Sequence, residues 1–278
     1  MRNQKKEIYY KTDEEIELIR HNCLLVCKAL TLVAELIGPG VAGKTIDEQA
    51  EQLIRDHGAV PGFKGLYDFP ATLCVSVNNQ VVHGVPYGQE FRDGDIVSVD
   101  CGVFMNNFYG DAAYTFPIGE VDEKVMELCR ITKASLYRGI EQAVSGKRIG
   151  DIGFAIQNYT ERQHRYGVVR ELVGHGVGRI LHEGPEVPNY GRRGQGVKMK
   201  EGLVIAIEPM INLGKRDVAT YEDGTVVARD NKPSAHYEHT VAVRKHKADI
   251  LSDHKPIEAA IQKNPNVREV EDILPVLV

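Results

Sequence analysis

Four acidic residues lie in segments whose other residues are mostly apolar or small. Asp100 and Asp111 interrupt the two apolar runs of VSVDCGVFMNNFYGDAAYTF, and Glu208 and Glu238 do the same in LVIAIEPM and AHYEHTVAV. Strand interiors select against Asp, and a buried carboxylate without a partner is costly. Taken singly, each acid is typical of a strand-end group that reaches solvent or pairs with Arg. Converging carboxylates, however, need compensating charge, and divalent cations bound through oxygen atoms would supply it.

One histidine refines this hypothesis. His175 lies between glycines in GHGVG, where the backbone can pass close to a bound group. An isolated histidine is usually a core or surface residue, but the acidic segments favour a metal ligand here. Four carboxylates and one imidazole suit a pair of Mn(II), Fe(II) or Co(II) ions better than structural zinc. Two such ions held close together would activate one water to hydrolyse a carbonyl or a phosphoryl bond.

The first two acids face one another if Asn106-Asn107 forms a hairpin turn. Residues two apart share a face of a strand. Asp100 would then lie opposite Ala113, with Asp111 as its diagonal neighbour on the same face, at a Cβ separation of about 7 Å or less. Gly102 would lie opposite Asp111 and leave room above the sheet.

Helices and short strands must position these side chains. Thr12-Asp13-Glu14-Glu15 is a capping box that predicts the start of a long helix, and Gly38-Pro39-Gly40 predicts its end. From about Lys247 the chain is polar with scattered Pro, which is typical of an appended segment with weak structure. Further helices are expected near 46–57, 121–144 and 150–165, and strands near 72–77, 81–85, 95–104, 108–116, 169–174, 203–208 and 237–243.

Three short motifs occur twice in the same order. In chain order, the helix start GKTID is echoed by GKRIGD, VVHGV by VGHGV, and DGDIVSVD by EGLVIAIE. Internal similarity usually reports duplicated supersecondary units, although strings this short also coincide by chance. We therefore expect two similar αβ halves that share one sheet. Residues 1–246 would form a single domain, and 247–278 a C-terminal extension of unknown role.

A match to the phosphate-loop pattern fails its context test. GPGVAGKT at 38–45 fits G-x-x-x-x-G-K-[ST] letter for letter. A phosphate loop needs a strand before it, so that its backbone N–H groups face the phosphates. The preceding segment is instead the best capped helix of the chain. The glycines and Pro39 are therefore expected to serve as a helix stop and a linker.

Composition places the chain among soluble globular proteins, with 42% apolar and 26% charged residues in a length of 278. The net charge of −5 argues against nucleic-acid binding, which leaves a basic footprint. We find neither the apolar core of a secretory signal nor the ~18 apolar residues of a membrane span. Five cysteines without a CxxC pair indicate a reduced, cytoplasmic protein. Nothing in the sequence demands an oligomer, so we expect a monomer.

Taken together, six segments resemble the type I methionine aminopeptidases, whose fold is called pita-bread. These segments stand in the family's order over about residues 10–245: VVHGVP, DIVSVDCG, the segment around Asp111, GHGVGRILHE, IAIEPM and YEHT. The resemblance implies an α+β fold with two pseudo-symmetric αβ halves around a curved antiparallel sheet, so that 1–246 would be one catalytic domain. It also implies a methionyl aminopeptidase, a metal-dependent hydrolase that removes initiator methionine from nascent proteins with a small second residue.

The resemblance assigns roles to individual residues. It implies two divalent ions (Co, Mn or Fe) bridged by Asp111 and Glu238, with Asp100 completing one ion and His175 with Glu208 the other. A water activated between the ions would attack the carbonyl after the first residue, and Glu208 would move its proton. The implied metal ligands are Asp100, Asp111, His175, Glu208 and Glu238. The implied catalytic residues are His83, near the scissile nitrogen, His182, at the developing oxyanion, and Glu208.

The resemblance also implies an apolar pocket for the methionine side chain, lined by Phe63, Leu66, Phe69, Cys74 and Leu181. The histidines His83 and His182 would contact substrate beside it. The chain contains no Trp, whereas many bacterial members place one on the loop near 223–225, and Leu66 replaces a frequent Tyr. Both departures alter the shape of the pocket, but an unbranched thioether needs mainly an adaptable apolar slot.

Two other functions fit the same scaffold. A proline-directed peptidase of this fold usually carries an extra N-terminal domain, and only about ten residues precede the first expected helix here. A non-catalytic relative that binds nascent chains or ribosomes usually loses metal ligands, and all five positions here carry suitable atoms. The expected partners are nascent polypeptide N-termini, with the ribosome as a second candidate and no membrane or nucleic acid.

Overall fold

The longest helix begins where the capping box predicts it. The computed structural model describes residues 7–273, and its first helix, α1, spans Asp13–Leu36. The Thr12 hydroxyl accepts a hydrogen bond from the Glu15 backbone N–H at 3.3 Å, and the Glu15 carboxylate accepts one from the Thr12 N–H at 3.1 Å. The apolar positions of the helix are buried. The segment 38–45 follows this helix rather than a strand, which excludes the phosphate-loop interpretation.

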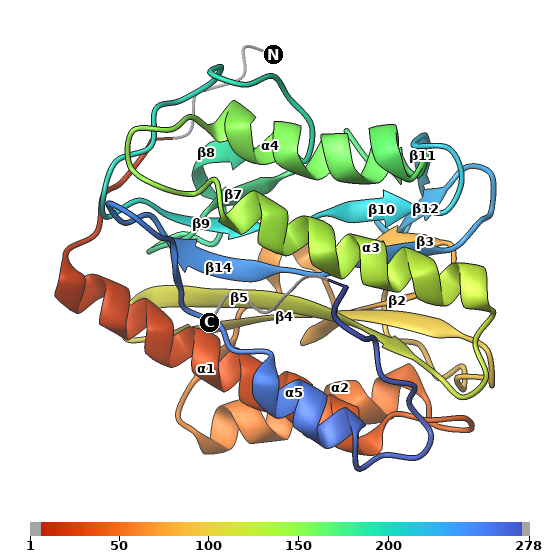
Figure 1. Cartoon of the computed structure of the whole chain (residues 1–278). Coiled ribbons are helices and arrows are strands. Elements are labelled where there is room, and N and C mark those ends of the chain that lie inside the picture. The colour runs from red at the N-terminus through yellow and green to blue at the C-terminus, as the bar shows by residue number, and fades with distance from the viewer. Residues whose placement is uncertain (1–6, 274–278) are drawn as a thin grey trace.

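The other elements alternate helices with short strands (Figure 1). The remaining helices are α2 (Gly43–Asp56), α3 (Glu123–Ile140), α4 (Ile149–Gln157) and α5 (Lys255–Ile261), with a 3-10 turn at Leu66–Asp68 and a π-helical turn at Asn158–Gln163. The strands are β1 (Val60–Pro61), β2 (Leu73–Val77), β3 (Gln80–Val82), β4 (Ile96–Met105), β5 (Phe108–Pro117), β6 (Gly167–Val168), β7 (Gly174–Gly176), β8 (Glu183–Val187), β9 (Val204–Ile207), β10 (Met210–Asn212), β11 (Val218–Thr220), β12 (Val226–Ala228), β13 (Ser234–His236), β14 (His239–Ala242) and β15 (Asp249–Ile250). Among the described residues, every helix is too short or too polar to cross a membrane.

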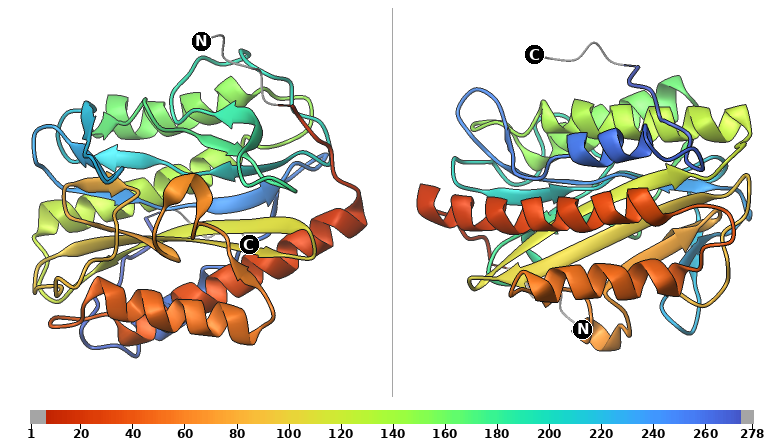
Figure 2. Two further views of the ribbon diagram at one scale, coloured as in Figure 1. Left: turned by 180° about the vertical axis from the view of Figure 1, so that it is seen from behind. Right: turned by 90° about the horizontal axis from the view of Figure 1, so that it is seen from below.

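Within residues 7–273 the strands form four antiparallel sheets, and the two larger groups of strands meet in the middle of the molecule. One group contains β1, β4, β2 and β5, and the other has the order β15-β14-β9-β7-β8. The two smaller sheets have the orders β13-β10-β6 and β11-β12-β3. Helix α1 packs on β4 and β5, whereas α3 and α4 cover the second group from its own side (Figure 2). Hydrogen bonds join the groups: among them, the Glu238 N–H donates to the Ala113 carbonyl at 3.0 Å, and the Thr240 hydroxyl to the Asp111 carbonyl at 2.8 Å. This arrangement confirms the α+β class and the two-halved architecture.

The hairpin between β4 and β5 has the predicted register. Asn106 and Asn107 adopt φ angles of +54° and +64°, as a two-residue type I′ turn requires. Asp100 pairs with Ala113, and Gly102 pairs with Asp111. The two aspartates therefore lie on one face of the hairpin.

Two expectations about elements were wrong. A strand was expected at 169–174, but β6 ends at Val168 and β7 begins at Gly174, because the chain passes from one sheet to another between them. The segment after Lys247 was expected to have weak structure. It instead forms β15 and α5, and its apolar side chains are buried against the rest of the protein, among them Leu251, Ile257, Ile261 and Val270.

Candidate metal centre and substrate pocket

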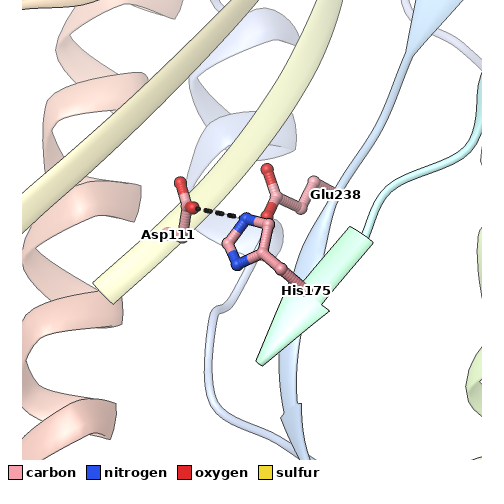
Figure 3. Close-up of side chains that lie close together, drawn as sticks. All are labelled: Asp111, His175 and Glu238. Carbon is pink, nitrogen blue, oxygen red and sulfur yellow. Dashed lines mark ion pairs between the residues drawn. The ribbon is translucent and has the colours of Figure 1, made fainter. Parts of the chain in front are cut away.

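Three of the expected ligands meet at one point in the middle of the molecule. The ligand atoms of Asp111, His175 and Glu238 all lie within 4.8 Å of one another (Figure 3). Asp111 comes from β5, His175 from β7, and Glu238 from the link between β13 and β14. All three side chains are buried. Residues distant in sequence, one from the first half of the chain and two from the second, thus form a single cluster.

The other two expected ligands join this cluster. Glu208, in the link between β9 and β10, places Oε1 at 3.5 Å from Nε2 of His175, which itself lies 3.6 Å from Asp111 Oδ2. Asp100 shares a hydrogen bond with Asp111. The structure therefore brings together all five side chains that the sequence singles out as ligands.

The four carboxyl groups of the cluster all have raised pKa values, so they do not all ionise near neutral pH without added positive charge. Burial raises the pKa of Asp100 to about 7. Burial, followed by the charge of the neighbouring carboxylates, raises the pKa of Asp111, Glu208 and Glu238 well above the usual range. Adjacent carboxylates can all be ionised only when positive charge is brought to them.

The imidazole is held so that one nitrogen faces the acids. His175 Nδ1 lies 3.0 Å from the carbonyl oxygen of Gly176. A hydrogen bond from the Nδ1 proton to this carbonyl leaves the Nε2 lone pair directed at Asp111 and Glu208. That is the tautomer a metal-binding imidazole needs.

Unpaired oxygen atoms show that the cluster fits divalent cations. Within the described residues, Asp100 Oδ1, Asp111 Oδ1 and Glu238 Oε1 are buried and accept no hydrogen bond. Buried polar atoms nearly always have partners, so these three atoms point to ligands that the protein itself does not supply. Carboxylate oxygens with a single imidazole are a donor set that divalent cations accept.

Gly174 and Gly176, the glycines on either side of His175, have a different structural role from the expected one. They were expected to let the backbone approach a bound group. A Cβ at Gly174 would instead lie 2.4 Å from the Ala206 carbonyl oxygen, and one at Gly176 would lie 2.3 Å from that of Gly184. The glycines therefore allow β7 to pass close to its neighbouring strands, which places His175 over the acids.

An apolar cluster adjoins this centre. Phe63, Cys74 and Leu181 are buried together, and Leu66 and Phe69 pack against them. These are the five residues expected to line a substrate pocket. Tyr109, a residue we had not assigned, packs against the same cluster. Its position two residues before Asp111 on one strand was the available signal, because such residues share a face.

Gly102 makes space for this cluster, but not as expected. The room above Gly102 is occupied by the Phe63 ring, whose Cε1 would lie 2.4 Å from a Cβ at position 102. We expect Gly102→Ala to displace Phe63 and to lower the free energy of unfolding by about 1–3 kcal/mol. Denaturant titration measures this loss. Gly88→Ala is the control, since a Cβ there meets nothing within 4 Å, and equal stabilities for the two variants would contradict the proposed packing.

One of the two expected substrate histidines, His182, borders the centre. The His182 ring lies edge-on to that of His175, with centroids 4.4 Å apart, and Tyr67 stacks on His182 at 5.9 Å. Tyr67 is 78% exposed, with a left-handed φ of +50°. His83 is also exposed and left-handed, at φ +59°. The position of Tyr67 beside His182 was not predicted from the sequence.

A further histidine lies behind Glu208. His236 Nε2 is 3.7 Å from Glu208 Oε2, and the side chain is almost completely buried. Burial, assisted by nearby His83, lowers the pKa of His236 to about 3, so this ring is neutral at physiological pH. The alternation AHYEH offered a signal for it, because His236 and Glu238 are two residues apart.

Comparison with known proteins identifies relatives over most of the chain. The sequence profile described as metallopeptidase family M24 matches residues 17–245. A methionine aminopeptidase of Clostridium perfringens (strain 13 / Type A) is 50% identical over 246 residues, which cover 88% of this chain and 98% of the relative. Methionine aminopeptidase 1 of Bacillus subtilis (strain 168) is 43% identical over 246 residues, with coverage of 88% and 99%.

Solved structures agree with this result. Methionine aminopeptidase from Rickettsia prowazekii superposes with a TM-score of 0.87 at 35% identity, covering 89% of this chain and 100% of that one. The enzyme of the same name from Thermotoga maritima gives 0.86 at 40% identity, with coverage of 89% and 100%. A prolidase from Pyrococcus furiosus gives 0.72 at 24% identity, and this chain covers only 65% of it, so that likeness shows the fold alone.

Proposed function

Since the chain belongs to metallopeptidase family M24, we propose that it hydrolyses the first peptide bond of nascent proteins and releases their N-terminal methionine. The observation that carries this proposal is the meeting of five ligand side chains beside the apolar cluster of Phe63, Cys74 and Leu181. A hydrolytic centre and a slot for an apolar first side chain are the two parts that such a reaction needs. The relatives named methionine aminopeptidase support it over the same residues.

The five ligands would hold two divalent ions, with Co, Mn and Fe as the candidates. Asp100, Asp111, His175, Glu208 and Glu238 would hold them, since their ligand atoms lie close together. When bound, the ions polarise the scissile carbonyl and activate a water. The fit rests on the buried oxygens that accept no hydrogen bond within residues 7–273 and on the orientation of His175.

The remaining catalytic roles belong to side chains of the chain itself. Glu208, whose pKa burial raises in this setting, would accept the proton of the attacking water and pass it to the leaving amine. His182, in ring contact with His175, would donate a hydrogen bond to the developing oxyanion. His83, which lies near enough to His236 to lower its pKa, would bind near the scissile nitrogen.

The setting of the reaction is part of the proposal. Residues 1–246 would form one catalytic domain and act as a monomer in the cytoplasm. Nascent N-termini with a small second residue would be the substrates, presented at the ribosome. The apolar cluster supports methionine as the first residue, since Leu66, Phe69 and Tyr109 extend it without adding charge.

Peptide hydrolysis tests the proposal against its closest rival. Protein loaded with Mn(II) or Co(II) is expected to release methionine from Met-Ala-Ser at least about 100-fold faster than it cleaves a peptide of the Xaa-Pro type. Liquid chromatography of the products measures both rates. Preferential cleavage of the Xaa-Pro peptide would indicate a proline-directed peptidase. Cleavage of neither, together with no bound metal after dialysis, would indicate a non-catalytic scaffold.

A further inference from the structure

The C-terminal extension lies outside the part of the chain shared with its relatives. The family profile ends at residue 245, and the Clostridium perfringens relative is covered almost completely by 246 aligned residues. The structure describes the extension as far as Ile273. It runs along α1 and back toward α3 (Figures 1 and 2). Its role must therefore be sought in what it touches.

The extension makes backbone contacts with β14 and with the end of β5. Strand β15 pairs with β14, which begins directly after Glu238, and the Leu251 N–H donates to the Thr240 carbonyl at 2.9 Å. Farther along, Val267 bridges to Ile118, and the Arg268 N–H donates to the Pro117 carbonyl at 2.9 Å at the end of β5. Strand β5 carries Asp111. The extension thus contacts the strand that follows Glu238 and the far end of the strand that carries Asp111.

Buried contacts hold the extension firmly in this position. Helix α5 packs on α1 through Ile257 and Ile261, both of which are buried. The Asn264 amide donates to the Ala34 and Ile37 carbonyls at the end of α1, at 2.8 Å and 2.9 Å. At the other end, Arg20 donates to Asp249 at 2.7 Å. These contacts keep the extension ordered beside the catalytic domain.

One residue receives a dense set of contacts from the extension. His239 directly follows Glu238 in the chain and is 2% exposed. Its Nδ1 lies 2.7 Å from the Ser252 hydroxyl, and its Nε2 lies 3.2 Å from the Tyr137 hydroxyl. The His254 ring stacks on it with centroids 3.7 Å apart. Two of these three neighbours, Ser252 and His254, belong to the extension, and they fix the rotation and the plane of the ring.

We propose that Ser252 and His254 are positioning residues of the metal centre, which hold Glu238 in place through His239. This inference rests on the proposed function of the five ligands. Converging carboxylates repel one another, so the backbone beside Glu238 needs a restraint from outside the cluster. Polar groups behind a metal ligand orient it, and their loss typically lowers metal affinity 10- to 100-fold. In this chain the extension supplies such a restraint at His239, the residue next to the carboxylate ligand Glu238.

Metal titration of full-length variants tests the proposal. Ser252→Ala is expected to weaken Mn(II) binding about 10-fold in a calorimeter and to alter the visible spectrum of bound Co(II), which reports ligand geometry. Ser252→Thr keeps the hydroxyl and should restore both. Ser252 borders a cavity of about 810 Å³ among the described residues, which provides room for the added methyl group.

Asn264→Ala is the matched control. It removes two hydrogen bonds between the extension and α1 but touches nothing beside His239. It should lower the unfolding temperature and leave Mn(II) affinity within about twofold of wild type. Wild-type affinity and spectrum in Ser252→Ala, or an equal loss in both variants, would overturn the positioning role alone. Absence of metal binding in the wild-type protein would overturn the proposed function as well.

Discussion

Replacing Glu238 by Gln is expected to lower kcat/KM for methionine release from Met-Ala-Ser by at least about 1,000-fold, or about 4 kcal/mol of transition-state stabilisation. Glu238 is 1% exposed and points its unpaired Oε1 into the cluster. Its amide replacement has nearly the same shape but cannot bridge two cations as an anion does. Initial rates at saturating Mn(II) measure the effect, and metal analysis should find fewer ions bound per chain.

The control for this variant is Glu186→Gln, since Glu186 is an exposed residue of β8. It should keep full activity. The Glu238→Gln protein should fold at least as well as wild type without metal, because a neutral amide avoids the cost of burying a carboxyl group beside other carboxyl groups. Activity within about tenfold of wild type would contradict the bridging role of Glu238.

The second large effect is on stability as a function of pH. Without metal, burial raises the pKa of Asp100 from 3.8 to about 7, so the folded state binds a proton that the unfolded state has already released. Stability from this group is fully present below the unfolded pKa and is lost as pH rises through about 7. Each pKa unit corresponds to about 1.4 kcal/mol. We therefore expect the unfolding temperature of the metal-free protein to fall by about 5 °C or more between pH 5 and pH 8.

Two comparisons isolate this effect. Asp100→Asn removes one of the four carboxyl groups whose pKa is raised, so its metal-free form should show a smaller decline over the same pH range. Mn(II) should raise the unfolding temperature more at pH 8 than at pH 5, because cations bind deprotonated ligands. Differential scanning calorimetry measures both. Metal-free wild type that becomes more stable toward pH 8, or that matches Asp100→Asn, would show that the carboxyl groups are not coupled as described.

Local pattern was sufficient to predict the hairpin and its two aspartates. Asn106-Asn107 favours a two-residue turn, and the strand period of two then determines which residues share a face. Both steps depend only on neighbours in sequence, and the observed register agrees. The convergence of Glu208 and Glu238 with them depends on how the two halves meet. That expectation came from the repeats and from the resemblance to a family, not from the strand pattern alone.

The predictions that were wrong or missing concern features that tertiary contacts determine. In the extension, Ile257 and Ile261 share one face of α5, but this helix has only seven residues, which is too short for a periodic pattern to reveal it. These residues, with Leu251 and Val267, are buried because α1 and the sheet offer a surface. The roles of Gly102, Gly174 and Gly176 likewise depend on Phe63 and on neighbouring strands. The stacking of Tyr67 on His182 depends on a left-handed backbone conformation at Tyr67, which no periodic sequence pattern predicts.

Anomalous scattering from crystals grown with Mn(II) tests the central claim most directly. Two peaks are expected in the cluster, each in contact with Asp111 and Glu238, one of them also with Asp100 and the other with His175 and Glu208. An empty cluster in the presence of millimolar Mn(II), or ions bound elsewhere on the surface, would contradict the account of this centre.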